Sequence, residues 1–165
     1  MRLLVLILVL IMYLPAVAFA SPQNATAGPF KISFDLNNVI IQPQDTSTYD
    51  IDGISVVGYR IKIIDPNSPA DGQVSINKYS APIPDSIEYG AESLAETYRS
   101  IYQDVVVDYR SIDGMNGYDV KGIEKNGRLS HSAGYRLSEQ IQVAIIGDLT
   151  DFESLLDTIH IESIP

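Results

Sequence analysis

Residues 105–147 read VVVDYRSIDGMNGYDVKGIEKNGRLSHSAGYRLSEQIQVAIIG, and this stretch decides the fold. It contains four extended runs: Val105–Ile112, Gly117–Lys125, Arg128–Leu137 and Gln140–Gly147. Short polar segments join the runs, and Asn126-Gly127 favours the positive φ angles of a type I′ hairpin turn. Because such short connections join antiparallel neighbours, the stretch predicts a four-stranded antiparallel meander.

Further strands are expected upstream of the meander. Residues 30–36 alternate apolar and polar side chains, which is the period of a half-buried strand. Residues 49–64 and 73–79 are also rich in strand-forming residues, and the loop DPNSPADG at 65–72 separates them. We expect these two segments to pair as a hairpin.

Two helices complete the pattern. Asp85 with Glu88 resembles a capping box and predicts a helix from Asp85 to about Gln103. A second box, Thr150 to Glu153, predicts a short helix with one apolar face over 152–159. The predicted class is therefore α+β: an antiparallel sheet of about six to seven strands covered by one long and one short helix, an α/β/α sandwich.

The N-terminus has the pattern of a secretory signal peptide over residues 1–20. Arg2 precedes an apolar run that ends at Pro15, and Ala18-Phe19-Ala20 is the small-residue motif of a cleavage site, which predicts cleavage after Ala20. The alternative is an uncleaved anchor, although the apolar run is shorter than the ~20 residues that span a bilayer. We expect a secreted or otherwise extracytoplasmic protein, held at a membrane only if the leader is kept.

Residues 21–29 are small and polar, and predict a disordered tether before a single domain over 30–165. Asn24-Ala25-Thr26 within the tether is an N-glycosylation sequon, so Asn24 is a candidate acceptor.

Charge and cysteine content exclude several functions. The formal net charge is −10 with 21 Asp and Glu against 11 Lys and Arg, a balance that repels nucleic acid. The chain has no cysteine, which excludes disulfides, thiolate catalysis, iron–sulfur clusters and thioether lipidation.

The order of the elements resembles the PsbP-like fold, which includes PsbP, Mog proteins and uncharacterised exported prokaryotic proteins. The segments that carry the resemblance are the 82–102 helix, the turn at 114–117 before Tyr118-Asp119-Val120, the 142–146 strand and the 152–159 helix. The resemblance implies an architecture; members bind different partners, so it implies no active site and no cofactor.

Oxygen ligands for calcium gather in one loop. Asp65, Asn67 and Asp71 are spaced there like the ligands of an EF-hand, but Pro69 replaces a ligand and Ile76 stands where the bidentate glutamate belongs. Turn chemistry alone also accounts for these residues. A zinc site is a weaker alternative, with His160, Asp157 and Glu162 as the available ligands.

Catalytic patterns are not met. His131 lies between Ser130 and Ser132, but neighbours in a strand point to opposite faces and do not form a triad. Carboxylate pairs form in three dimensions, so spacing alone leaves a hydrolase open. The tyrosines at 98, 102, 109 and 135 are expected in core packing rather than in a sugar or peptide groove.

Together these patterns favour an exported, non-catalytic binding or accessory domain whose partner is an extracytoplasmic protein or a surface component. A calcium- or small-ligand-binding domain is the first alternative. A hydrolase with an unrecognised carboxylate site is the second, and would have two carboxyl groups with raised pKa values in a deep pocket.

Overall fold

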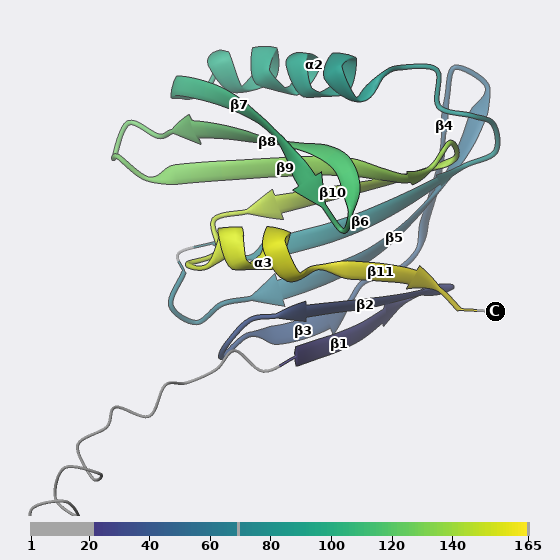
Figure 1. The fold of residues 1–165 in the computed structure, drawn as a ribbon, viewed down its shortest axis with the longest axis horizontal. Helices are drawn as coiled ribbons and strands as arrows, with labels where there is room; N and C mark the ends of the chain where they lie inside the picture. The colour runs from purple at the N-terminus through teal and green to yellow at the C-terminus, as the bar shows by residue number, and fades with distance from the viewer. Residues whose placement is uncertain (1–21, 69, 165) are drawn as a thin grey trace, which may run out of the picture.

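The computed structural model describes residues 22–68 and 70–164, and shows an α+β protein with mostly antiparallel strands and two helices (Figure 1). The strands are β1 (Pro22–Ala27), β2 (Phe30–Asp35), β3 (Ile40–Pro43), β4 (Ser47–Ile51), β5 (Ile54–Ile64), β6 (Gly72–Tyr79), β7 (Gln103–Ile112), β8 (Met115–Ile123), β9 (Leu129–Ser138), β10 (Ile141–Gly147) and β11 (His160–Ser163). The helices are α2 (Ile87–Arg99) and α3 (Phe152–Thr158). Among the described residues, no helix has the length and apolar character needed to cross a bilayer.

The strands form two sheets where the sequence predicts one. An eight-stranded sheet has the order β3-β5-β6-β10-β9-β8-β7, with β4 also paired to β5. A three-stranded sheet has the order β1-β2-β11. The predicted β7–β10 meander and the β5–β6 hairpin are confirmed.

The prediction of a disordered tether over 21–29 is wrong for the residues that the structure describes. Pro22–Ala27 is β1, and it pairs with β2 along its length. Small polar residues cannot bury an apolar face of their own, but here β2 supplies the hydrogen bonds and Ala27 joins the core. The strand also carries Asn24, whose side chain is exposed.

Each face of the eight-stranded sheet is covered by different elements. On one face, apolar side chains of β5, β6, β9 and β10 pack against β2, β11 and α3. On the other face, Tyr118 and Val120 of β8 pack against Ala91, Ala95 and Tyr98 of α2. Figure 1 shows α2 running along β7 and β8, with the three-stranded sheet on the far side of the larger sheet.

The ends of α2 and the type of one hairpin turn differ slightly from those that the sequence patterns predict. The N-cap is Ser86, whose hydroxyl accepts from the Tyr89 N–H, rather than Asp85, and the helix ends at Arg99. At Asn126-Gly127 only the glycine has a positive φ, 84°, so the turn is not type I′. Two other turns have positive φ angles at both central residues: Asp52-Gly53, at 52° and 82°, and Asp113-Gly114, at 54° and 71°.

The role of β1 leads to a stability prediction. Ala27→Asp places a charge in the core, where only 4% of the alanine is exposed, and should lower the free energy of unfolding by at least ~2 kcal/mol. Thr26→Asp, on the exposed side of the same strand, should change it by less than about 0.5 kcal/mol. Urea denaturation of both variants measures the difference; equal and negligible effects would mean that β1 is not part of the folded unit.

Candidate functional site

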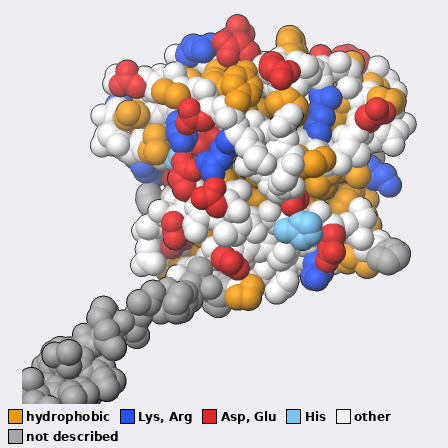
Figure 2. All heavy atoms as spheres, viewed as in Figure 1, with side chains coloured by type: hydrophobic (Ala, Val, Ile, Leu, Met, Phe, Trp, Pro, Cys, Tyr) orange, Lys and Arg blue, Asp and Glu red, His pale blue; other side chains and the backbone are white. Residues whose placement is uncertain are grey.

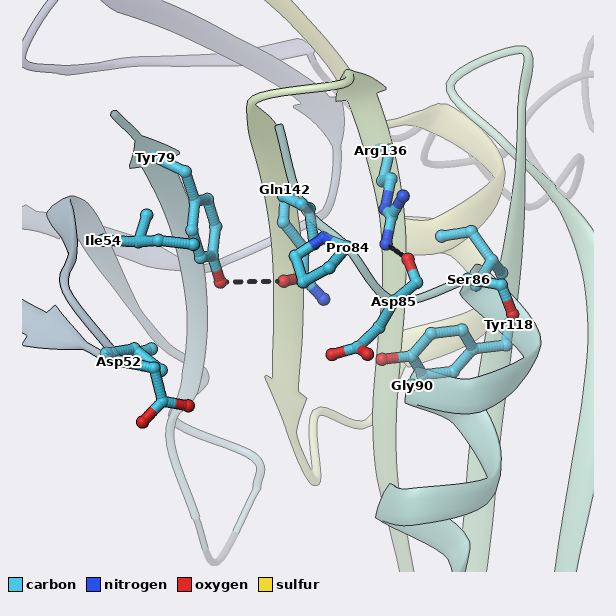
Figure 3. A pocket seen from close by; sticks show the side chains of 13 residues that line it. Asp52, Ile54, Tyr79, Pro84, Asp85, Ser86, Gly90, Tyr118, Arg136 and Gln142 are labelled. Atoms are coloured by element: carbon cyan, nitrogen blue, oxygen red, sulfur yellow. Dashed lines mark hydrogen bonds between the residues drawn. The ribbon is translucent and has the colours of Figure 1, made fainter. Parts of the chain in front are cut away.

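A pocket of about 220 Å³ opens between the start of α2 and the larger sheet, and we call it the α2 pocket (Figure 3). Polar and apolar residues from six separate segments of the chain line it. They are Ile51, Asp52, Ile54, Tyr79, Ile83, Pro84, Asp85, Ser86, Ile87, Gly90, Tyr118, Arg136 and Gln142. The site is thus assembled by the tertiary fold rather than by one local motif.

The floor of the α2 pocket is set by strand register. Tyr118 of β8 lies opposite Gly134 of β9, and two residues further along β9, Arg136 lies opposite Gln142 of β10. A Cβ atom at Gly134 would come within 2.7 Å of the Tyr118 hydroxyl, so the missing side chain makes room for the tyrosine ring. The register and this glycine together place Tyr118 and Arg136 on the α2 side of the sheet.

Backbone hydrogen bonds hold the walls of the α2 pocket. The Ile83 N–H donates to the Glu139 carbonyl at 2.8 Å, which ties the segment before α2 to the β9–β10 turn. Ser80 donates its N–H to the Ser55 carbonyl at 2.9 Å, and Ser55 donates its N–H to the Ser80 hydroxyl at 3.1 Å. These bonds bring the β4–β5 hairpin and the start of α2 to opposite sides of the floor.

Two polar groups in the α2 pocket lack partners among the described residues. Tyr118 is only 6% exposed, and its hydroxyl, which faces the pocket in Figure 3, forms no hydrogen bond with them. Arg136 makes one, from Nη2 to the Asp85 carbonyl, while its buried Nε has no partner. Tyr79, in contrast, donates its hydroxyl hydrogen to Gln142 Oε1 at 3.1 Å.

Burial raises the pKa of Tyr118 above its ordinary value of 10.0, and Tyr79 adds to the increase while Arg136 opposes it. The hydroxyl therefore keeps its proton at neutral pH and is a hydrogen-bond donor. With Arg136, the pocket offers two donors on its floor and isoleucine side chains in its walls.

A second cluster of functional groups lies on the opposite face of the sheet, beside α3. Asp119 is fully buried, and its carboxylate oxygens lie 3.2 and 3.4 Å from His131 Nδ1. The His131 ring stacks on Phe152 with a centroid distance of 4.6 Å.

Lys121 forms the ion pairs of this cluster. Its Nζ lies 2.8 Å from a carboxylate oxygen of Glu153, 3.0 Å from one of Asp108 and 3.4 Å from one of Asp119. Figure 2 shows acidic and basic side chains packed against one another on the side where α3 lies.

Asp119, His131 and Glu153 could together hold a metal ion, since their ligand atoms lie within 4.8 Å of one another. However, the Lys121 ammonium already contacts both carboxylates. Burial alone would lower the pKa of Lys121, but Glu153 and Asp108 raise it well above 10.5, so the ammonium stays charged. A divalent cation would have to displace the Lys121 ammonium, and the cluster is best described as an ion-pair network.

The proposed calcium ligands do not converge. Asp65 accepts from the N–H groups of Asn67 at 2.9 Å and Thr150 at 3.1 Å, so it joins the β5–β6 loop to the start of α3. Burial would raise the pKa of Asp65, but these hydrogen bonds outweigh it and the pKa is lowered. Asp71 instead forms an ion pair with Lys62. The loop residues therefore serve turn and tertiary contacts.

The remaining candidate residues are also dispersed. His160 contacts Asp113, Glu162 pairs with Lys31, and Asp157 pairs with Arg110, so they form no zinc site. The core packing predicted for Tyr98 and Tyr135 is confirmed, whereas Tyr109 is 57% exposed and the prediction for it is wrong. β7 is an edge strand, so the outer side of Tyr109 has no neighbouring element to pack against.

The leader over 1–20 and its cleavage position lie outside the described residues. No family model, no curated protein and no solved structure matches the chain.

The sequence patterns did not predict the α2 pocket or the cluster around Asp119 and Lys121, although the position of one turn indicated some of their contacts. The Asn126-Gly127 turn fixes the β8–β9 register, which sets Lys121 opposite His131 and Tyr118 opposite Gly134. A glycine opposite an aromatic residue indicates a ring that lies across the neighbouring strand. No sequence signal places the β4–β5 hairpin or the start of α2 around Arg136.

The contacts of Asp65 predict how the acidic loop responds to mutation and calcium. The Asp65 carboxylate accepts from two N–H groups, and the amide of Asp65→Asn has only one oxygen that can accept. The substitution should therefore lower the free energy of unfolding by about 1–2 kcal/mol, with or without calcium. Asp71→Asn, which loses only an exposed ion pair, should cost less than about 0.5 kcal/mol. Thermal melting with and without millimolar calcium tests this; a calcium-dependent rise in melting temperature that both variants abolish would establish a calcium site.

Lys121 predicts a pH-dependent contribution to stability. Its ammonium holds the pKa of Glu153 below 4.5, so their interaction stabilises the fold above that pH and is lost as the pH falls through the lowered value. Lys121→Met should therefore cost about 2 kcal/mol at neutral pH, with Asp119 left buried, and less in acid. Lys125→Met is the control, because it removes the same positive charge from an exposed turn. Denaturant melts across this pH range measure the effect, and a cost that does not shrink in acid would contradict it.

Proposed function

We propose that this chain is an exported, non-catalytic binding domain and that the α2 pocket receives its ligand. The observation that carries the proposal is the pair of donors on the pocket floor: the Tyr118 hydroxyl, which lines the pocket and forms no hydrogen bond with the described residues, and the Arg136 Nε, which is buried without a partner. Leaving a buried donor such as the Arg136 Nε unsatisfied costs about 1–3 kcal/mol, and the accessible Tyr118 hydroxyl can donate to water or to a ligand.

The size of the α2 pocket supports a small binding partner or one end of a larger one. Pockets for drug-sized ligands measure about 300–1,000 Å³, and this one measures about 220 Å³. A small molecule fits, and so does a single group presented by an extracytoplasmic protein or a surface component. Both are consistent with an accessory role outside the cell.

The alternatives have less support. The calcium proposal needs Asp65 and Asp71 in one place, and they serve different contacts. The hydrolase proposal needs carboxyl groups with raised pKa values, whereas the pKa values of Asp65 and Glu153 are lowered. His131 is oriented by Asp119, but Ser130 and Ser132 lie on the α2 face beside Tyr98, away from the histidine ring.

Export and the PsbP-like architecture are parts of the same proposal. Export is supported by the leader pattern ending in Ala18-Phe19-Ala20. The PsbP-like α/β/α arrangement is supported by the apolar faces of α2 and α3, which pack on opposite faces of the eight-stranded sheet.

A plugged pocket tests the proposed function. A Cβ atom at Gly90 would lie 3.8 Å from the Tyr118 hydroxyl without a clash, so the larger side chain of Gly90→Leu should extend into the α2 pocket. Leucine also favours the helix by up to about 1 kcal/mol over glycine, so the variant should fold. A fragment screen by saturation-transfer NMR should give hits for the chain from Ser21 onward that Gly90→Leu loses.

The matched control is Ser93→Leu, which adds the same side chain on the exposed side of α2 and should keep the hits. The proposal fails if the screen gives no hits at all, or if Gly90→Leu and Ser93→Leu retain the same ones.

A further inference from the structure

Among the described residues, Arg136 forms no ion pair with a carboxylate, although the chain is strongly acidic. The sequence has 21 Asp and Glu against 11 Lys and Arg, and Arg110 and Arg128 each contact two carboxylates. Arg136 contacts none among the described residues and donates only to the Asp85 carbonyl. Its Nε is buried without a partner, so the guanidinium retains unused donors at the α2 pocket.

Tyr118 adds a second donor from the neighbouring strand. Because Tyr118 lies opposite Gly134, and Arg136 is two residues beyond Gly134 on the same face, both donors reach the same floor. Figure 3 shows the Tyr118 hydroxyl and the Arg136 guanidinium on the side of the pocket that α2 borders. A guanidinium matches the geometry of a carboxylate, and a phenol hydroxyl on the same floor supplies a further donor.

The N–H groups in the first turn of α2 are not the source of the preference for a carboxylate. Ser86 caps this turn by accepting from the Tyr89 N–H. The Glu88 carboxylate interacts with its own N–H and with Ser86, and these interactions together with the charge of Arg136 lower the pKa of Glu88. The anion preference therefore comes from the two side chains of the floor.

We propose that the α2 pocket binds a single carboxylate group joined to a small apolar group, with the carboxylate on Arg136 and Tyr118 and the apolar group against the isoleucine walls. This inference rests on the proposed function and names its ligand class. The wall residues that would contact the apolar group are Ile51, Ile54, Ile83 and Ile87.

The rim of the α2 pocket limits the charge of the ligand. Asp52 and Asp85 are exposed and lie at the edge of the pocket. Solvent screens their repulsion of one carboxylate, but a phosphate dianion would face two acidic groups with only one guanidinium to balance it. The donors of the floor, the isoleucines of the walls and the aspartates of the rim therefore all favour a ligand with one negative charge and an apolar body.

Three isosteric probes on the wild-type chain test the ligand class by calorimetry: 4-methylpentanoate, its neutral amide, and 3-methylbutylamine. The carboxylate should bind in the millimolar range or tighter and at least about tenfold better than the amide, the ratio that one charge-assisted hydrogen bond provides. The amine should not bind. An amide as tight as the acid, or a tighter amine, would overturn the carboxylate assignment.

Variants locate the carboxylate on the two donors. Arg136→Gln and Tyr118→Phe should each weaken 4-methylpentanoate about tenfold while leaving the amide within about twofold. Lys78→Gln removes one positive charge from an exposed position on β6, and Tyr109→Phe removes an exposed hydroxyl on β7. Both controls should bind as the wild type does, and a loss of equal size in the controls would contradict the assignment.

A peptide pair distinguishes a free acid from the end of a polypeptide. Acetyl-Gly-Leu with a free carboxylate is compared with the same peptide amidated at its C-terminus. Tighter binding of the free peptide than of 4-methylpentanoate assigns the site to a chain terminus, and the reverse order assigns it to a small acid; both support the inference. If no acid binds although the fragment screen gives pocket hits, the ligand class is wrong and the proposed function stands. If neither the acids nor the fragments bind, both the carboxylate assignment and the proposed function are wrong.

Discussion

Strand β9 is covered on both faces, and this constraint decides which side chains it can carry. Toward the main core it presents Ala133 and Tyr135, which pack with β2, β5, β6 and β10. Toward α2 it presents Ser130, Ser132 and Gly134. Small residues are required there because the Tyr118 ring lies over β9, and any Cβ at Gly134 would come within 2.7 Å of its hydroxyl. The position of that ring then defines one side of the α2 pocket.

The two groups of polar residues in the sheet differ in how their charges are balanced. On the α3 face, Asp119 is buried but has His131 and Lys121 beside it, and Lys121 also contacts Glu153 and Asp108. Such a network is satisfied from within, and it contributes to stability rather than to ligand binding. On the α2 face, Arg136 and Tyr118 keep donors that no described residue uses. That difference, and not the amount of charge, separates a structural cluster from a candidate binding site.

Much of the fold was predictable because short turns fix their neighbours. The β7–β10 meander, the β5–β6 hairpin and both helices follow from periodicity and turn residues. β1 was not predictable, since residues 22–27 become a strand only through pairing with β2. The two-sheet arrangement has the same origin: β11 pairs with β2, which lies far from it in sequence, and no local pattern encodes that contact.

The site was less predictable than the fold. Register alone brings Asp119 near His131 and Tyr118 opposite Gly134, so these pairs could be read from the Asn126-Gly127 turn. The sequence does not reveal that Asp65 and Asp71, which lie in one loop, have different partners, the Thr150 N–H and Lys62. Walls formed by Ile51 and Ile83 depend on hydrogen bonds between distant segments, which sequence patterns do not reveal.

The most direct test of the account observes the Arg136 guanidinium itself. In protein labelled with ¹⁵N-arginine, titration with 4-methylpentanoate should shift the Nε–Hε signal of Arg136 in a saturable way, because that buried group gains an acceptor. The signals of Arg110 and Arg128, which already contact carboxylates, should stay in place. An Arg136 signal that does not move, or that drifts together with all the others, would contradict the central claim.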